Sequence, residues 1–206
     1  MSDIVALFHE IPTTAISDTM QGLNNMDPSI KPLKEEFRIA GRAFTVKMPV
    51  GDNLCVLRAI HEAKPGDILV VDAKGDTYRT IAGDFIVGLA QTLGIKGIIT
   101  DGVVRDILGV KKLNFPVFCK GTTVASSAKG GWGQVSVDIS CGGTSVSPGD
   151  IIVADADGVV VVPKSIEEDV LKKAQEKLIQ EEEREAMISG NPDAVREYLN
   201  KMLAKK

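Results

Sequence analysis

The stretch LGIKGIITDGVVRD, residues 93–106, carries an apolar strand directly into a polar loop. The run 97–100 predicts a short buried strand, and the Asp101-Gly102 pair that follows it is typical of a turn. Arg105 and Asp106 then lie side by side. Loops at strand ends are where a rigid scaffold displays functional groups. The two adjacent charges are therefore either a surface ion pair or part of a reactive site.

The segments outside this stretch alternate between helical and strand patterns. Helical spacing predicts helices at 17–23, 51–63 and 83–94, and short apolar runs predict strands at 41–48, 65–73 and 115–121. From residue 135 to residue 163 the pattern is all β, with turns at Gly142-Gly143 and Pro148-Gly149. Because βα units are mixed with β-only stretches, we expect a layered α/β domain rather than a regular Rossmann fold.

Two strand segments have similar sequences. PGDILVVDAKG (65–75) and PGDIIVADADG (148–158) each contain a Pro-Gly-Asp turn, a buried strand and an Asp-Ala pair. Their separation is too wide for a solenoid repeat. They are either two pseudo-equivalent strands of one sheet or one common turn-and-strand solution that is used twice.

The composition excludes several classes of protein. The 206 residues suit one domain with or without an appendage, and 44% hydrophobic with 25% charged residues is ordinary for a globular chain. A net charge of −4 without a basic run argues against nucleic-acid and anionic-membrane partners. No apolar run is long enough to span a bilayer, and the N-terminal MSDIVALFHE lacks the pattern of a signal peptide.

The cysteines indicate the redox environment. Cys55, Cys119 and Cys141 are odd in number and form no Cys-x-x-Cys motif. This usage suits reduced thiols in a reducing cytoplasm, where we expect the protein. We expect each cysteine to be a small core residue.

The C-terminal region predicts two helices. Ser165 and Glu168 match a capping box that would start the first helix, and Asn191-Pro192 would cap and start the second. An apolar stripe then follows, made of Val195, Tyr198, Leu199 and Met202. It would pack either on a neighbouring subunit or on its own domain. We therefore divide the chain into a core domain, residues 1–165, and C-terminal helices, residues 166–206, which pack on the core or on a neighbour.

The available side chains limit the chemistry. With only His9 and His61 present, a His-based triad or a His-rich zinc site is disfavoured. A metal would need oxygen ligands, which favours Mg²⁺ or Mn²⁺. The candidate carboxylates at strand or helix ends are Asp84, Asp101 and Asp106.

Asp84 opens the predicted helix 83–94. A helix N-terminus offers backbone N–H groups and a partial positive charge, so the amides around Phe85 and Ile86 could bind an anionic substrate. The alternatives are structural. Asp84 and Asp106 would be helix caps, and Arg105 would be the partner of a nearby carboxylate.

The spacing of these residues resembles a known family. Gly83-Asp84, an interval of twenty residues (85–104), and Arg105-Asp106 are similar to the signature of the class II pyruvate aldolases. Those enzymes act on 4-hydroxy-4-methyl-2-oxoglutarate and 4-carboxy-4-hydroxy-2-oxoadipate. The same family includes RraA-like regulators of ribonuclease E. The segments 51–73, 93–106 and 146–163 resemble it too, and the likeness covers residues 16 to 190.

The resemblance implies a fold, an assembly and a site. The fold would be a swivelling β/β/α sandwich with a C-terminal helical extension, assembled as a homotrimer or a dimer of trimers with sites between subunits. Mg²⁺, or Mn²⁺, would lie near Asp106 and be held largely through waters, and Asp84 would support metal-bound water. Arg105 and the start of the helix, Gly83 to Ile86, would hold pyruvate derived from a small 2-oxo acid substrate.

That assignment fits the reaction. Retro-aldol cleavage of a 4-hydroxy-2-oxo acid leaves an enolate on the pyruvate fragment, which a divalent ion and the permanently charged, forked Arg105 would stabilise. Oxaloacetate decarboxylation passes through the same enolate. The segment DGVVRD contains no lysine, which favours a metal over a Schiff base.

The chain also departs from the family pattern. Relatives often carry an acidic residue shortly after the Arg-Asp pair, where this chain has Ile107, Leu108 and Gly109. Active relatives take an acid from a neighbouring subunit's C-terminal region, which the run 181–183 (Glu-Glu-Glu) could supply unless it is a solvated helix face. The stretch 122–134 suggests a flexible loop near the site, with Trp132 as a contact or a core anchor.

Three functions follow from these observations. The first is a metal-dependent pyruvate aldolase and oxaloacetate decarboxylase, which we favour because Asp84, Arg105 and Asp106 are all present. The second is a non-catalytic RraA-like regulator that binds a ribonuclease or a helicase. The third is a methyltransferase, which we disfavour because no glycine-rich loop follows a first strand.

Overall fold

The computed structural model describes residues 3–204 and contains one large curled sheet. The strand order is β1-β5-β4-β3-β2-β9-β10, and β6 pairs with β2. These strands are β1 (Lys31–Pro32), β2 (Ile39–Lys47), β3 (Ile68–Asp72), β4 (Gly97–Thr100), β5 (Val117–Cys119), β6 (Gln134–Val135), β9 (Ile151–Asp155) and β10 (Gly158–Val162). The two ends of the sheet approach each other, since Lys31 Nζ donates to the Asp157 carbonyl at 2.7 Å.

Strand β2 belongs to both halves of this sheet. Its residues 39–42 pair antiparallel with β9, and its residues 43–47 pair in parallel with β3. Gly41 lies at the crossing, where a Cβ would stand 2.8 Å from Ile68 Cγ1, so a side chain is excluded there. The parallel strands β2 to β5 and the antiparallel pair β9–β10 can therefore face in different directions while they share one backbone ladder.

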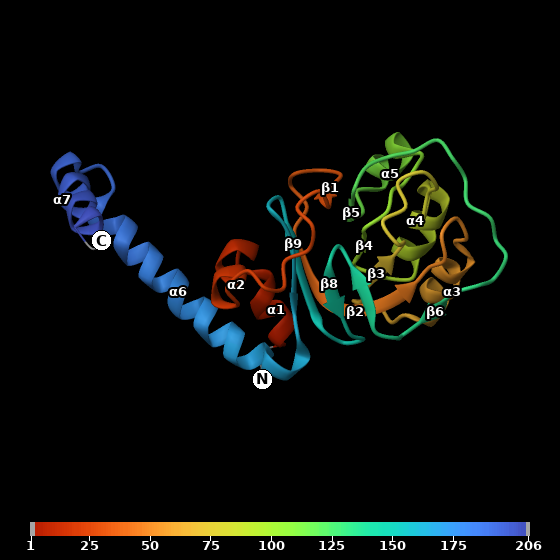
Figure 1. The fold of residues 1–206 in the computed structure, drawn as a ribbon, viewed down its shortest axis with the longest axis horizontal. Helices are drawn as coiled ribbons and strands as arrows, with labels where there is room; N and C mark the ends of the chain where they lie inside the picture. The colour runs from red at the N-terminus through yellow and green to blue at the C-terminus, as the bar shows by residue number, and fades with distance from the viewer. Residues whose placement is uncertain (1–2, 205–206) are drawn as a thin grey trace.

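Two layers cover the faces of the parallel strands (Figure 1). Helices α3 (Leu54–Glu62), α4 (Asp84–Thr92) and α5 (Ile107–Leu113) cover one face. The hairpin of β7 (Ile139–Cys141) and β8 (Thr144–Val146) lies against the other. Alternate residues of a strand point to opposite faces of the sheet, so Val71 packs with the helices and Val70 packs with the hairpin.

A third layer covers the outer side of β9 and β10. It consists of α1 (Ile4–His9), α2 (Thr13–Thr19) and the first turns of α6 (Glu167–Ile188). Phe8 and Ile16 are fully buried against Val160, and Val170 of α6 closes the same cluster. Residues from both ends of the chain thus share one core.

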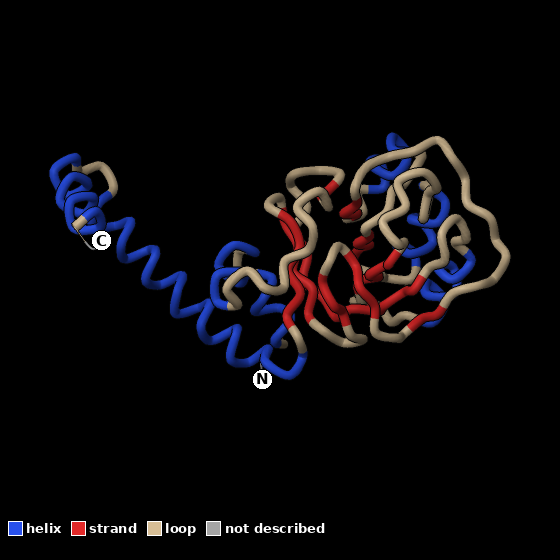
Figure 2. The backbone as a smooth tube through the Cα atoms, viewed as in Figure 1, coloured by secondary structure: helices blue, strands red, loops and turns tan. Residues whose placement is uncertain are grey.

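The C-terminal helices extend away from this core (Figure 2). The polypeptide enters α6 through a 3₁₀ turn, η1 (Lys164–Ile166), and α7 (Pro192–Leu203) packs against the far end of α6. We call residues 179–203 the arm. Ile179 is 56% exposed and Leu199 is 50% exposed, so the arm presents apolar side chains to solvent.

The two predicted caps have different outcomes. The prediction of a capping box at Ser165 is wrong. Ser165 lies inside the 3₁₀ turn, and α6 begins at Glu167 without a side-chain cap. The amide of Ile166 bonds to the Pro163 carbonyl, which tightens the turn before the helix starts. The second cap is confirmed, since the Asn191 side chain accepts from the amides of Asp193 and Ala194.

The fold class predicted from the sequence is confirmed. The predicted helix 17–23 is misplaced, because α2 begins after Pro12 and ends before Gln21 and Gly22, which have φ of 57° and 72°. All three cysteines are buried and unpaired. Within the described residues, no helix combines the length and the apolar composition that a bilayer crossing requires.

The similar segments 65–75 and 148–158 become β3 and β9. Both strands pair with β2, β3 in parallel and β9 antiparallel, so they run in opposite directions. Their turns have the same hydrogen bond, in which Asp67 accepts from the Lys64 amide and Asp150 accepts from the Ser147 amide, both at 2.8 Å. The two segments are therefore strands of one sheet, as the first interpretation predicts, and they share one turn structure, as the second predicts.

Candidate active site

The candidate site is built from three segments that leave the parallel sheet side by side. Thr80 bridges Val103, and Val104 bridges Thr122, each in parallel. These residues follow β3, β4 and β5, so the ladder continues beyond the sheet edge. The starts of α4 and α5 are therefore held next to the loop that follows β5. Ligand sites of open α/β sheets lie at this edge of the strands.

Asp106 has an unusual backbone conformation. Its φ and ψ of 55° and 41° are left-handed, a region that Asp tolerates better than most residues with a side chain. It occupies the N-cap position of α5, but its side chain makes no capping hydrogen bond. Its carboxylate instead turns toward the start of α4, where Oδ2 lies 3.2 Å from Nε of Arg105. The cap alternative therefore does not account for the Asp106 side chain.

Two glycines make room for the two carboxylates. A Cβ on Gly83 would stand 2.2 Å from Asp106 Oδ2, and a Cβ on Gly109 would stand 2.3 Å from Asp84 Oδ2. The glycine before α4 thus accommodates the carboxylate from α5, and the glycine inside α5 accommodates the carboxylate from α4. This reciprocal fit lets each carboxylate lie close to the backbone of the neighbouring element. The sequence spacing alone does not reveal it.

The charged pair is accessible. The Arg105 side chain is 39% exposed and that of Asp106 is 45% exposed. The backbone of Arg105 is held more firmly than its head group, because its amide donates to the Ala82 carbonyl at 3.1 Å. A half-exposed ion pair contributes little to stability, roughly 0–1 kcal/mol. Its partners can therefore turn to a ligand at low cost.

The first turn of α4 offers fewer free groups for substrate binding than its sequence suggests. The Phe85 amide donates to Asp84 Oδ1 at 2.7 Å, so in this structure Asp84 already occupies an amide that we expected to bind substrate. The Ile86 side chain is only 8% exposed and belongs to the core. Asp84 is the first residue of α4, and Gly83 takes the N-cap position.

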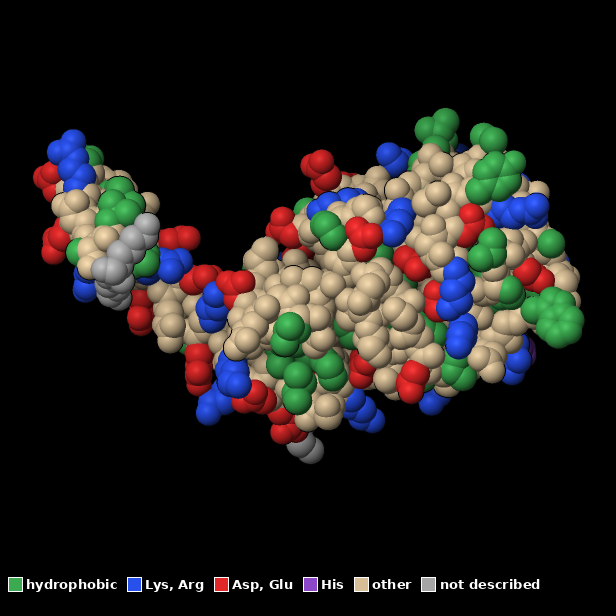
Figure 3. All heavy atoms as spheres, viewed as in Figure 1, with side chains coloured by type: hydrophobic (Ala, Val, Ile, Leu, Met, Phe, Trp, Pro, Cys, Tyr) green, Lys and Arg blue, Asp and Glu red, His purple; other side chains and the backbone are tan. Residues whose placement is uncertain are grey.

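Two hollows meet at Gly109, one on each side of α5. The first, which we call the Arg105 hollow, has a volume of about 570 Å³ and is lined by Arg105, Asp106, Ile107, Leu108, Gly109, Thr122, Thr123 and Val124. The second, about 670 Å³, lies between α4 and α5 and includes Asp84, Phe85 and Leu113. Figure 3 shows hydrophobic side chains gathered at this end of the molecule. Charged and apolar groups therefore adjoin at the candidate site.

Asp101 is not part of the site. It is buried at the end of β4 and accepts from the amides of Ala73 and Gly75 at 2.7 and 3.0 Å. Burial raises the pKa of its carboxyl group above the ordinary value. Its carboxylate stabilises the turn after β3, so we exclude it as a metal ligand.

The remaining donors fit a hydrated divalent cation. Among residues 3–204, no group of three or more His, Cys, Asp or Glu side chains is placed to hold a metal ion. Mg²⁺ commonly binds through one or two carboxylates and keeps several waters. Asp106 offers one accessible carboxylate, fixed in the space that Gly83 leaves. The oxygen-only donor set at this position therefore fits Mg²⁺ or Mn²⁺.

The loop 122–134, which we call the strap, is more firmly held than its composition suggests. It passes around the outer side of α4 and α3 (Figure 2). Ala128 exchanges backbone hydrogen bonds with Gly51 and Asn53. Trp132 is 76% exposed, so it is not a core anchor. Backbone hydrogen bonds therefore join the strap up to Ala128 to neighbouring segments, and the expectation of a flexible loop stays a prediction.

Asp52 is a residue that the sequence interpretation missed. Its carboxylate accepts from the Leu54 amide at 3.1 Å and faces the amides of residues 130–132. The Leu54 hydrogen bond and then those of the strap hold the pKa of Asp52 below its ordinary value. A Cβ on Gly130 would stand 2.6 Å from Asp52 Oδ2, so the glycine-rich composition permits this close approach. The paired glycines at 130–131 were the available signal.

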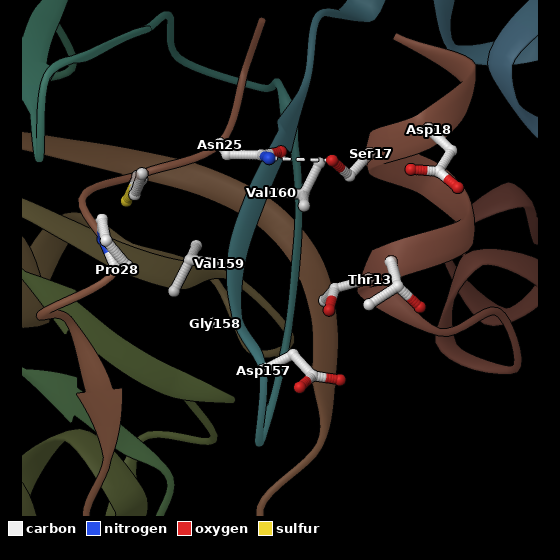
Figure 4. Close-up of a pocket in the computed structure, with 11 residues that line it drawn as sticks. Thr13, Ser17, Asp18, Asn25, Pro28, Asp157, Gly158, Val159 and Val160 are labelled. Atoms are coloured by element: carbon white, nitrogen blue, oxygen red, sulfur yellow. Dashed lines mark hydrogen bonds between the residues drawn. The ribbon is translucent and has the colours of Figure 1, made fainter. Parts of the chain in front are cut away.

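A separate hollow of about 330 Å³ lies between α2 and β10 (Figure 4). Ser17 Oγ accepts from Asn25 Nδ2 at 2.8 Å across it, Val159 and Val160 line it, and Asp157 stands at one end. It lies at the β9–β10 end of the sheet, away from α4 and α5 (Figure 1). We therefore do not assign it to the candidate site.

The acidic run 181–183 also lies apart from the site, on the arm. Glu181 is within 3.8 Å of Lys177 and 3.9 Å of Arg184, while Glu182 and Glu183 are exposed. Within one chain these carboxylates form a solvated helix face. A role in catalysis would require a second copy of the chain.

Comparisons with known proteins agree with this arrangement. The family model described as "RraA-like: Aldolase/RraA" matches residues 13–161. A relative from Halalkalibacterium halodurans, named "Putative 4-hydroxy-4-methyl-2-oxoglutarate aldolase", is 55% identical over 201 residues, which cover 98% of this chain and 96% of the relative. An uncharacterized protein from Pseudomonas syringae pv. tomato has a similar solved structure, with a TM-score of 0.83, 28% identity and coverage of 96% of this chain and 93% of that one.

A second solved structure comes from Streptomyces coelicolor and is described as an unusual member of the RNase ES inhibitor RraA protein family. Its TM-score is 0.82 at 29% identity, and the match covers 91% of this chain and 99% of that one. The family match spans most of the chain and includes the candidate site. The chain therefore belongs to the RraA-like family, Aldolase/RraA.

Proposed function

We propose that this chain is a divalent-metal-dependent aldolase that cleaves a 4-hydroxy-2-oxo acid to pyruvate and a second carbonyl compound. The name of the 55% identical relative supports aldolase activity at the level of the family. The observation that carries the proposal is the reciprocal fit of Asp84 and Asp106 on Gly109 and Gly83 beside Arg105. A protein that acted only through surface contacts would not need two carboxylates placed in this way.

Arg105 has the clearest role in this reaction. When the C3–C4 bond breaks, its electrons move onto the pyruvate fragment as an enolate. The Arg105 guanidinium is always protonated and forked, so it binds a carboxylate and an adjacent enolate oxygen better than a point charge does. Decarboxylation of oxaloacetate leaves the same enolate, and we propose that the same site catalyses it.

Asp106 and Asp84 have separate roles in the proposed reaction, metal binding and proton transfer. Asp106 would hold Mg²⁺ or Mn²⁺ together with water molecules, and the ion would supply a Lewis acid to the 2-oxo group. Asp84 keeps Oδ1 on the Phe85 amide, which leaves Oδ2 beside Gly109 to hold a water molecule that carries protons. The 4-hydroxyl proton and the proton that C3 receives would pass through such water.

An inhibitor of a ribonuclease is the second candidate. The relative from Streptomyces coelicolor is described in those terms, and the folds are alike over most of both chains. The two functions predict different results in one assay. A regulator would bind a ribonuclease and release no pyruvate, whereas an aldolase would release pyruvate without a partner.

The decisive experiment follows pyruvate release from oxaloacetate by the purified chain with Mg²⁺, and then tests a panel of 4-hydroxy-2-oxo acids. We expect turnover that EDTA abolishes and that Mg²⁺ or Mn²⁺ restores. Full activity in the metal-stripped protein would contradict the metal requirement. Pyruvate release from none of the substrates, by folded protein with metal present, would overturn the proposed aldolase.

A further inference from the structure

We infer that the hollow between α2 and β10 receives helix α5 of a second copy of this chain. The hollow, which we call the α2 hollow, has a volume of about 330 Å³, and the side chains of Val159 and Val160 line it. Asp18 borders it on α2, and Asp157 borders it at the turn before β10 (Figure 4). An apolar lining beside carboxylates is complementary to a segment that carries an apolar side chain and a cation.

The exposed face of α5 has this composition. Leu108 lies in the first turn of the helix and is 81% exposed in the single chain. A large apolar side chain with this exposure is typical of a surface that binds a partner. Lys112, in the last turn, follows Leu108 by four residues, so the two side chains share one face of the helix. The face therefore presents an apolar side chain one turn before a cation.

The charges of the two surfaces indicate how they meet. Asp18 already forms an ion pair with Lys177 of α6. Asp157 is exposed, and Lys31 Nζ donates to its backbone carbonyl at 2.7 Å. Among the described residues, neither the Asp157 carboxylate nor the Lys112 ammonium group forms an ion pair. With Leu108 in the α2 hollow of a second copy, Lys112 would therefore meet Asp157.

A single chain cannot make this contact with itself. The α2 hollow lies at the β9–β10 end of the sheet, away from α5 (Figure 1). Each copy would therefore offer its α5 face to one neighbour and its α2 hollow to another. Contacts of this head-to-tail kind form a ring when the rotation between copies closes. Figure 3 shows open space between the arm and the core beside α2, which leaves room for the neighbour.

Charge reversal tests this contact. We expect Lys112→Glu and Asp157→Lys each to raise the dissociation constant of the assembly roughly tenfold or more, because each brings two like charges together. The double variant restores an opposite pair between copies and should assemble as the wild type does. Analytical ultracentrifugation of the full-length chains measures each constant. Lys64→Glu reverses an exposed lysine in the loop before β3, so it is the matched control and should assemble normally.

The double variant makes the result specific. Since the α2 hollow lies away from α5 within one chain, restored assembly would report a contact between copies. Single variants that assemble as tightly as the wild type would overturn the inference, and so would a double variant as weak as the single ones. The measurement uses neither metal nor substrate, so its outcome is independent of the proposed reaction.

Disulfide trapping tests the same contact without changing any charge. Leu108→Cys is combined in one chain with Thr14→Cys, since Thr14 is exposed and lines the α2 hollow. The three native cysteines are buried. Mild oxidation should link copies of the double variant into covalent oligomers, whereas chains with one added cysteine should run as monomers on a denaturing gel. Monomers alone from the double variant, or dimers from Leu108→Cys by itself, would overturn the head-to-tail contact.

Discussion

At the scale of single residues, Arg105 and Asp106 show how one dipeptide can direct two charges to one place. Consecutive side chains in a strand or a helix point in different directions. The left-handed conformation of Asp106 removes that separation and turns its carboxylate toward Nε of Arg105. Adjacent residues of opposite charge thus reach the same hollow from one short loop.

The shape of the Arg105 head group should matter as much as its charge. We predict that Arg105→Lys retains the positive charge but loses kcat/KM by roughly two orders of magnitude or more, because lysine cannot make a planar two-pronged contact. Steady-state kinetics with oxaloacetate would measure the loss, and circular dichroism would confirm folding. A folded variant with near-normal kinetics would give Arg105 a structural role.

The glycine before α4 allows a test by added volume. A Cβ on Gly83 would meet the Asp106 carboxylate, so we predict that Gly83→Ala lowers kcat/KM about a hundredfold or more by displacing that group. Gly88→Ala is the matched control, since a Cβ there would lie 3.9 Å from Leu113 Cδ1, an ordinary contact. In the middle of α4 that change should stabilise the fold by roughly 0.5–1 kcal/mol.

A double mutant locates the origin of the Gly83 effect. If the Asp106 carboxylate is what the new methyl group meets, Gly83→Ala should cost little stability in an Asp106→Ala background. Thermal unfolding of both single variants and of the double variant gives the coupling. Additive effects would show that Gly83 is required for another reason.

At the scale of elements, the strap shows what holds an irregular segment in place. Its composition predicts flexibility, yet backbone pairs link it to residues 51–53, 79–80 and 104. Asp52 adds a charged acceptor at the N-terminus of α3, where amides of the helix and of the strap converge. The strap is therefore an extension of the sheet edge, and its Thr122–Val124 end forms a wall of the Arg105 hollow.

Asp52 should make the stability of the protein depend on pH. Its pKa lies below the ordinary 3.8 because the amides of Leu54 and of the strap favour the charged form. The stabilisation is therefore complete above about pH 3.8 and disappears as the pH falls through the lower folded value. We predict that Asp52→Asn unfolds at a lower temperature than the wild type at pH 7, and that the gap narrows toward pH 3.

Thermal scans across that range measure the effect. Asp138→Asn, which changes an exposed carboxylate near the strap, is the matched control and should unfold at the wild-type temperature at pH 7. A gap for Asp52→Asn that stays constant from pH 7 to pH 3 would assign its effect to shape rather than to charge.

The sequence predicts the positions of helices and strands well where a local hydrophobic pattern determines them. The strands β2 to β5 and the helices α3 and α4 lie within a few residues of their predicted positions. Helix α1 was missed, because its six residues are too short for periodicity and depend on the burial of Phe8 against distant strands. The roles of Asp52, Gly83 and Gly109 were not predicted from the sequence for the same physical reason. Each acts through a residue that lies far away in sequence, and the paired glycines at 130–131 are the one local pattern that points to such a contact.

At the scale of the whole molecule, the arm extends from the core and exposes apolar side chains to solvent. Val195, Leu199 and Met202 of α7 are 37%, 50% and 49% exposed, and α7 packs at the far end of α6. A helix of this length is marginal in water without tertiary packing. We therefore propose a homotrimer or a dimer of trimers in which the arm contacts a neighbouring copy.

Light scattering at micromolar protein tests this assembly. We predict a mass of three or six chains for the full-length protein, and weaker assembly for a chain truncated after Gly190. Leu199→Asp should weaken assembly, whereas Asn200→Asp, its matched control, adds the same charge outside the apolar stripe. A monomeric mass for the full-length protein would contradict the proposal.

A complementation assay asks whether the arm also serves the site. An Asp106→Ala chain and a chain altered at Glu181–Glu183 would each lack one part of a shared site. Mixed assemblies should recover pyruvate release if the acidic run of one copy reaches the site of another. Confirmed hybrids without recovery would place each site within one chain.

The shared core of α1, α2 and β9–β10 also constrains how the chain is made. Phe8 and Ile16 are synthesised well before Ile151 and Val160, which share their core cluster. The helices and strands between residues 39 and 119 can pair before that point, since their partners lie close in sequence. A nascent chain stalled before β9 therefore has paired strands between residues 39 and 119 but leaves the apolar faces of α1 and α2 uncovered, so we expect such stalled chains to bind chaperones.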